Sequence, residues 1–103
     1  MITRRRIITW FVLVGNFPVD ESKTQPYHYQ PDINSSNKDI ERYEEIMGKL
    51  CSELDVGFLP IFQETFKADY LELLFDDGVH PNSKGHEFLA TKIWNFMIDN
   101  HWV

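Results

Sequence analysis

The sequence is poor in cysteine and in clustered basic residues. Its single cysteine, Cys51, cannot form an internal disulfide and takes an apolar position in a helical pattern, so we expect it to be a small core residue. Ten Lys and Arg against sixteen Asp and Glu give a formal net charge of −6, and the basic residues cluster only at 4–6. Because phosphate binding requires clustered Lys and Arg, no nucleic-acid partner is expected.

The chain also lacks an apolar run long enough to cross a bilayer. Residues 7–14 follow a basic start, as in a secretory signal, but no cleavage site of the Ala-x-Ala type comes after them. We therefore interpret 7–14 as a buried strand and expect no membrane partner. A cytoplasmic location is the resulting expectation, and secretion is the alternative.

What is present fits one small α/β domain. Hydrophobic residues make up 43% and charged residues 25% of 103 residues, a balance that favours a single packed fold over disorder. Continuous apolar runs at 7–14 and 57–62 are typical of strands covered on both faces of a parallel sheet. Helical periodicity predicts helices at 37–54 and 84–99 and a helical turn at 70–75. Two strands are too few for a stable parallel sheet, so the domain looks incomplete.

The two predicted helices have apolar stripes and polar starts. In the first, Ser36 or Asn37 supplies a capping oxygen, and in the second Asn82 or Ser83 does so. The first stripe is predicted to comprise Ile40, Tyr43, Met47, Leu50 and Leu54. The acidic face opposite it is interpreted as solvated and comprises Glu41, Glu44, Glu45, Lys49 and Glu53. The second stripe comprises Phe88, Leu89, Ile93, Phe96 and Met97.

The segment 20–36 has no period and is predicted to be a long loop, of the kind that is often functional. Its aromatic residues Tyr27, His28 and Tyr29 have two readings: they line a substrate cleft, or they cover one end of the core.

A chemically suggestive stretch lies at 76–86, between an apolar run and the last helix. Asp77 and His80 stand three residues apart on a loop punctuated by Gly78 and Pro81. Asp-Gly is an ordinary turn dipeptide and His-Pro an ordinary extended step, so this pair alone is weak evidence. A tight loop nevertheless lets a carboxylate hold one imidazole nitrogen while the other faces a reactant.

The combination Asp-Gly-Val-His-Pro-Asn-Ser-x-Gly-His, followed at once by an amphipathic helix, resembles the SGNH or GDSL-type hydrolase family. The resemblance extends from about Ile7 to Met97. It implies the C-terminal portion of a flavodoxin-like, three-layer α/β/α parallel sheet. It also implies that His80 is the catalytic base of a Ser-His-Asp ester hydrolase and that Asp77 is the acid that orients it.

The family's nucleophile and oxyanion-hole motifs are absent, because the sequence contains no Gly-Asp-Ser and no Gly-x-Asn-Asp. The serines fall in predicted loops, caps or helix, and they are Ser22, Ser35, Ser36, Ser52 and Ser83. We therefore expect residues 1–103 to form one partial domain without the N-terminal strands, inactive alone. The alternative is a non-catalytic remnant or an assembly module of the same fold.

Two kinds of partner follow from this reading: a small acyl-ester substrate once the site is completed, and a protein at the edge of strand 7–14. The protein is a complementing N-terminal fragment or a second copy of the chain. No cofactor is predicted. A weaker alternative is a metal site built from Asp76, Asp77, His80 and His86, although their spacing matches no specific zinc motif.

Overall fold

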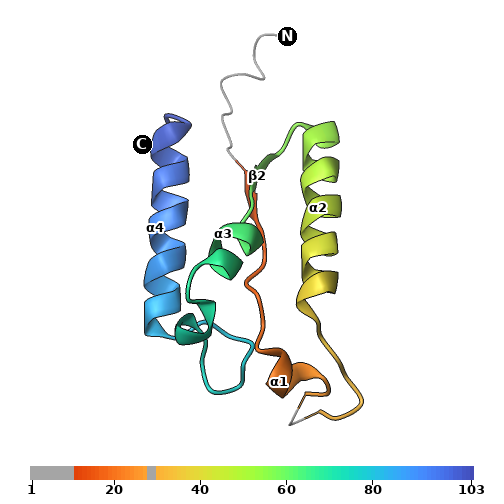
Figure 1. Cartoon of the computed structure of the whole chain (residues 1–103). Helices are drawn as coiled ribbons and strands as arrows, with labels where there is room; N and C mark the ends of the chain where they lie inside the picture. The colour runs from red at the N-terminus through yellow and green to blue at the C-terminus, as the bar shows by residue number, and fades with distance from the viewer. Residues whose placement is uncertain (1–10, 28–29) are drawn as a thin grey trace.

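The computed structural model describes residues 11–27 and 30–103, which form a small α/β unit around two parallel strands. Strand β1 spans Val12–Val14, strand β2 spans Gly57–Leu59, and Val12 lies opposite Gly57 in the register. The long helix α2, Asn37–Leu54, connects them (Figure 1). The predicted order of strand, helix and parallel strand is therefore confirmed.

Among the described residues, each strand comprises three residues, fewer than the sequence predicts. Of the strand expected at 7–14, Val12–Val14 is observed, and residues 7–10 lie outside the described part of the chain. β2 ends at Leu59, because Pro60 has no backbone N–H with which to extend the ladder. Phe62 then begins a short helix, α3, Phe62–Lys67, where the prediction continued the strand.

Helices α2 and α4 cover opposite faces of the strands. A Cβ placed on Gly48 of α2 would lie 3.2 Å from the ring of Phe58, and one placed on Gly57 would lie 3.6 Å from the ring of Phe96 in α4, Ser83–Asp99. Successive side chains of a strand point to opposite faces, so the two helices lie on opposite sides. Figure 1 shows the strands between them, which makes three layers.

The other elements lie at the carboxyl ends of the strands. A short helix, α1, Glu21–Thr24, interrupts the loop predicted at 20–36, and the 3₁₀-helix η2, Tyr70–Leu73, confirms the helical turn expected at 70–75. Asn82 is the N-cap of α4, as predicted. Within the described part of the chain, no helix is both long and apolar enough to cross a membrane.

Most of the small apolar core lies near these carboxyl ends, whereas Cys51 lies in the last turn of α2, before β2 begins. Cys51 is buried, as the sequence predicts. Val19 follows β1, while Ile61 and Phe62 follow β2. Leu74 is also buried and lies two residues before Asp76, so this part of the core lies next to the loop that carries Asp77 and His80.

The buried face of α2 differs from the predicted one. The exposed fractions of Tyr43, Leu50 and Leu54 are 65%, 51% and 64%, although all three belong to the stripe expected in the core. Glu44, expected on the solvated face, is only 7% exposed. The described sheet has two strands and covers a narrow strip of the helix, so helical periodicity overestimates how much of the stripe is buried.

Candidate functional site

The stretch after η2 folds into a tight, antiparallel loop. Leu74 and Pro81 form an isolated β-bridge, and the amide of Phe75 donates to the carbonyl of His80 at 2.7 Å. Gly78 has a φ of 74°, a conformation that side chains other than glycine's adopt rarely, and its amide donates to Phe75 at 3.0 Å. The Asp-Gly turn is therefore built into the loop that carries the imidazole.

Within this loop, Asp77 holds His80. One carboxylate oxygen, Oδ2, lies 2.5 Å from Nδ1 of the ring, and Oδ1 accepts the amides of Val79 and His80 at 2.8 and 3.0 Å. An ionised carboxylate can only accept, so Nδ1 carries the hydrogen and Nε2 is the basic nitrogen. The His80 side chain is 71% exposed, which leaves Nε2 accessible to a reactant.

The contacts of Asp77 lower the pKa of its carboxyl group. Partial burial acts in the opposite direction and is the largest single influence. The hydrogen bond from the His80 ring, the backbone hydrogen bonds from His80 and Val79 and the charge of His80 together outweigh it. Asp77 therefore stays ionised below the usual titration range of an aspartate, as an acceptor for the ring requires.

Helix α4 fixes one side of the loop through its first turn. The Asn82 side chain accepts the amide of Gly85 at 2.9 Å and donates to the carbonyls of Glu72 and Leu74 at 2.8 and 3.0 Å. A Cβ on Gly85 would lie 2.3 Å from the carbonyl oxygen of Leu73, so only glycine permits this approach. The end of η2 and the start of α4 are thus locked together beside His80.

The segment after β1 fixes the other side. The amide of Asp20 donates to the carbonyl of Gly78 at 2.9 Å, and Nζ of Lys23 donates to the carbonyl of Asp76 at 3.0 Å. Helix α1 accordingly lies beside the loop in Figure 1. These two contacts attach the Asp77–His80 loop to the segment that follows β1, more than fifty residues earlier in the chain.

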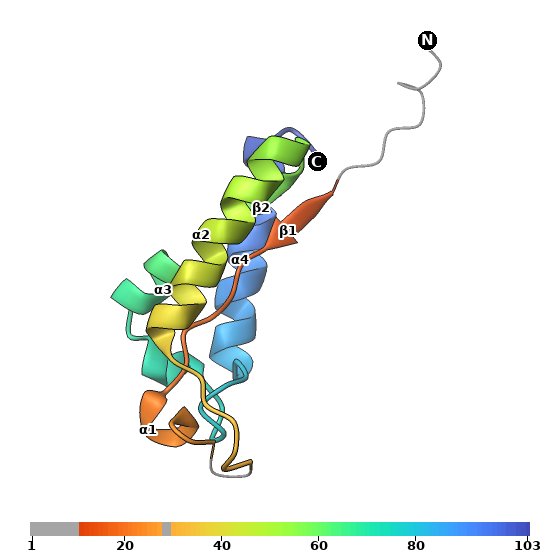
Figure 2. The ribbon, with the colours of Figure 1, turned by 90° about the vertical axis from the view of Figure 1, so that its right-hand side faces the viewer.

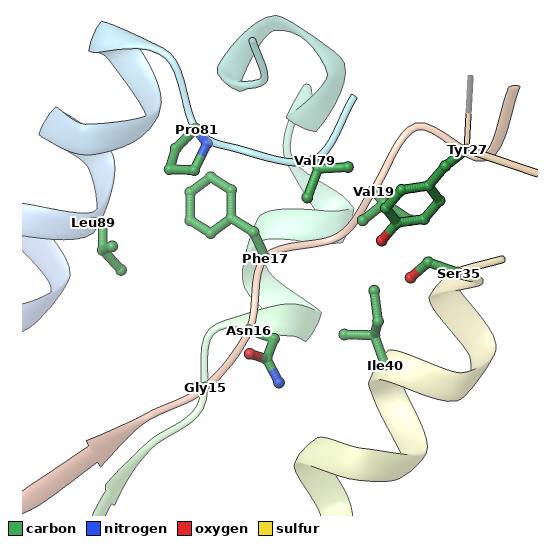
Figure 3. Close-up of a pocket in the computed structure, with 10 residues that line it drawn as sticks. All are labelled: Gly15, Asn16, Phe17, Val19, Tyr27, Ser35, Ile40, Val79, Pro81 and Leu89. Carbon is green, nitrogen blue, oxygen red and sulfur yellow. The ribbon is translucent and has the colours of Figure 1, made fainter. Parts of the chain in front are cut away.

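A cavity of about 330 Å³ lies at the carboxyl end of β1, beside the same loop (Figure 3). Val79 and Pro81, the neighbours of His80, border it, and so does Tyr27. The remaining lining is mostly apolar and consists of Gly15, Asn16, Phe17, Val19, Ser35, Ile40 and Leu89. The sequence left open whether Tyr27, His28 and Tyr29 line a cleft or cover the end of the core. Tyr27 lines a cavity, whereas His28 and Tyr29 lie outside the described residues.

Two curated proteins resemble the chain. A GDSL esterase/lipase of Arabidopsis thaliana is 26% identical over 97 residues, which is 91% of this chain and 38% of that protein. A GDSL lipase of Mycobacterium tuberculosis is 36% identical over 52 residues, which is 50% of this chain and 22% of that protein. The chain is similar to GDSL-type esterases and lipases. This GDSL-like chain spans about two fifths of the first relative's length and less of the second's. No family profile and no solved structure matches it.

The prediction that the acidic side of α2 is solvated is wrong at Glu44. Oε1 of this residue accepts the amides of Asn16, Ile61 and Phe62 at 3.1, 3.0 and 3.1 Å, and Oε2 also accepts Phe62 at 3.1 Å. The carboxylate thereby joins the segments that follow β1 and β2 in this GDSL-like chain. A glutamate among neighbouring glutamates carries no sequence signal that separates it from them.

The sequence offers Ser36 or Asn37 as the cap of α2, and it does not indicate the other role that Asn37 takes. Ser36, not Asn37, caps α2, through a hydrogen bond that its hydroxyl accepts from Asp39. Asn37 is buried and pairs with the backbone of Val19: Oδ1 accepts its amide at 2.7 Å, and Nδ2 donates to its carbonyl at 2.9 Å. It thus fixes the lining segment beside the cavity.

The metal-site alternative finds no support in the described part of the GDSL-like chain. In residues 11–27 and 30–103, no three His, Cys, Asp or Glu side chains form a group suited to a metal ion. The Asp77 carboxylate is occupied by His80 and by backbone amides, and His86 is exposed on the first turn of α4. The four residues of that alternative therefore do not make a metal centre.

Proposed function

We propose that this chain supplies the general base and its orienting acid to a GDSL-type carboxylic ester hydrolase. The observation that carries the proposal is the 2.5 Å contact between Nδ1 of His80 and Oδ2 of Asp77, with Nε2 accessible. A base must be held in one tautomer and one direction to take a proton efficiently. The anchored loop provides both conditions.

In the proposed reaction, Nε2 of His80 removes the proton from a serine hydroxyl as the serine oxygen attacks the acyl carbon. The imidazolium is stabilised by Asp77 and then gives the proton to the departing alkoxide, which leaves as an alcohol. Water, deprotonated by the same nitrogen, releases the acid from the acyl-enzyme, and the proton returns to the serine.

None of the five serines lies in a Gly-Asp-Ser motif, and we propose that the serine of this scheme belongs to another polypeptide segment. Ser35 borders the cavity but follows no strand: its amide donates to the carbonyl of Thr24 at 2.9 Å, and its carbonyl accepts the Thr24 hydroxyl at 2.8 Å. The Ser22 hydroxyl donates to Asp20 at 2.6 Å, and the Ser36 hydroxyl caps α2. Ser52 lies inside α2, and Ser83 begins α4. We therefore propose that the isolated chain lacks acyl-enzyme chemistry and that a second polypeptide segment completes the site.

The finer fold assignment belongs to the same proposal. Two parallel strands between α2 and α4 fit the C-terminal portion of a flavodoxin-like sheet. In such sheets ligands bind beyond the carboxyl ends of the strands, where the cavity and His80 lie. The apolar lining of that cavity supports a small acyl ester as the substrate class.

The test is hydrolysis of p-nitrophenyl acetate by the chain alone and by the chain mixed with the part of the Arabidopsis relative that lies outside its matching segment. The mixture should hydrolyse the ester and the chain alone should not. His80→Ala should lower the rate by a factor of about 10²–10⁴, since it removes the base. His86→Ala, which replaces an exposed histidine in the first turn of α4, is the matched control and should leave the rate unchanged.

The absent nucleophile also favours a second candidate, a non-catalytic remnant that keeps the fold. Restored hydrolysis that survives His80→Ala would exclude the assigned role of this residue. A complex that forms without any hydrolysis would favour the remnant.

A further inference from the structure

Among the described residues, strand β1 is paired with β2 and its other edge has no partner strand. The amide of Gly15 donates to the carbonyl of Leu59 at 2.8 Å, toward β2. Because successive amides of a strand alternate between its two edges, the amide of Val14 points away from β2. Leu13 is exposed beside it, and Figure 2 shows β1 at the outer side of the unit. An apolar strand with a free edge is a template for another strand.

The exposed stripe of α2 lies on the same side as this free edge. Ile40 borders the cavity beside Asn16, which follows β1. On the other side of the helix, Glu45 and Lys49 border a separate hollow beside Phe58 of β2. By the helical period, the residues on the Ile40 side are the exposed Tyr43, Leu50 and Leu54. The helix thus presents apolar side chains beyond β1, where a third strand would run.

The cavity continues this surface toward His80. Its lining comes from α2 at Ile40, from the segment after β1 at Phe17, and from α4 at Leu89 (Figure 3). The lining includes the segment that follows β1 and no residue of β2 or of the segment that follows β2, so the cavity lies on the β1 side at the carboxyl ends of the strands. The cavity lies at the carboxyl end of β1, beside the Asp77–His80 loop.

We propose that the free edge of β1, the stripe of Tyr43, Leu50 and Leu54, and the cavity form one docking surface for a polypeptide that adds a third, parallel strand. The strand would be apolar on both faces, because α2 covers one side of it and α4 the other. The loop after it enters the cavity and faces His80. This inference rests on the proposed function and names the partner that function needs.

The length of the Arabidopsis relative supports a separate polypeptide as the partner at this docking surface. The matching segment is 38% of the Arabidopsis protein, so most of that protein has no counterpart in this chain. A second copy of the chain fits the surface less well. Each copy has a formal net charge of −6, which opposes self-association. Two copies related by a two-fold axis would also pair β1 antiparallel to β1, placing the two cavities at opposite ends of the joint.

The partner used in the test is the part of the Arabidopsis relative that lies outside its matching segment, mixed with the full chain. Complex formation is measured by sedimentation velocity, and amide exchange of Val14 by NMR. Leu50→Glu places a charge on the docking surface, while Ser52→Glu places the same charge at an exposed position of α2 off the stripe. Circular dichroism establishes that both variants keep the fold.

We expect a one-to-one complex, slower exchange of the Val14 amide in the complex, and binding weakened about tenfold or more by Leu50→Glu but not by Ser52→Glu. No complex, or a complex that Leu50→Glu leaves intact, overturns the proposal. A dimer of the chain alone that Leu50→Glu dissociates overturns it in favour of a second copy. A complex with Val14 protection and no ester hydrolysis supports the docking surface while it contradicts the proposed function.

Discussion

The amide of Phe62 donates to both carboxylate oxygens of Glu44, at 3.1 Å each. Oε1 of the same carboxylate also accepts the amides of Asn16 and Ile61. One side chain of α2 therefore accepts three amides in the segments that follow β1 and β2. It also supplies an acceptor for the first turn of α3, because Ile61, the N-cap residue of α3, has no side-chain acceptor. Asn16, whose amide Glu44 accepts, also borders the cavity.

Replacement of Glu44 should weaken the fold in proportion to the acceptors lost. Glu44→Ala leaves buried amides without a partner, so we expect it to lower the free energy of unfolding by about 2–4 kcal/mol. Glu44→Gln keeps one acceptor oxygen and should cost less. The exposed Glu45→Ala is the control and should stay within about 0.5 kcal/mol. Urea denaturation measures all three, and equal effects at 44 and 45 would contradict the assignment.

Stability should depend on pH through Asp77. Its pKa is lowered in the folded chain, so the unfolded chain binds the proton more readily and the carboxylate stabilises the fold above its unfolded pKa of about 3.9. This contribution should disappear as the pH falls through the folded pKa. The difference in unfolding free energy between the native chain and Asp77→Asn should therefore shrink below about pH 4. Asp32→Asn, at an exposed position, is the control, and a constant Asp77→Asn difference from pH 7 to pH 3 would refute the linkage.

Gly85→Ala should destabilise the chain, against the usual trend in helices. Alanine inside a helix is normally favoured over glycine by about 0.5–1 kcal/mol. At Gly85, however, the new Cβ would meet the carbonyl oxygen of Leu73 at 2.3 Å and Cβ of Pro81 at 2.7 Å. We expect a loss of about 1–3 kcal/mol, measured by thermal denaturation. Gly48→Ala meets only the Phe58 ring, at 3.2 Å, and should cost less; the reverse order would contradict the close packing of α4 on η2.

Asn37 should not be replaceable by aspartate, although both are good helix-start residues. Asn37→Asp keeps the acceptor for the amide of Val19 but sets a carboxylate oxygen against the carbonyl of Val19. We expect a loss of about 1–3 kcal/mol in urea denaturation, close to that of Asn37→Ala. Asn34→Asp, at an exposed position in the same loop, provides the comparison. Full stability of Asn37→Asp would show that the pairing with Val19 carries little free energy.

The local elements were predictable because each depends on residues close in sequence. The period of apolar residues from Ile40 to Leu54 and the polar residue before each helix determined α2 and α4. The spacing of Asp77 and His80 on an Asp-Gly turn indicated the contact that the structure shows. The sequence could not reveal which side of α2 is buried, because that depends on how many strands lie beneath it.

The sequence by itself determined the class of fold, the motif and the resemblance to GDSL-type hydrolases, since these reside in local patterns and in residue identity. Tertiary structure alone decided that Glu44 is a buried acceptor and that Asn37 pairs with Val19, because their partners are backbone groups 17 to 28 positions away whose directions no local pattern encodes. It also decided that the apolar stripe of α2 overhangs the free edge of β1. The stripe faces this way because α2 packs on β2. The apolar side chains of α2 that do not contact β2 therefore lie beyond β1.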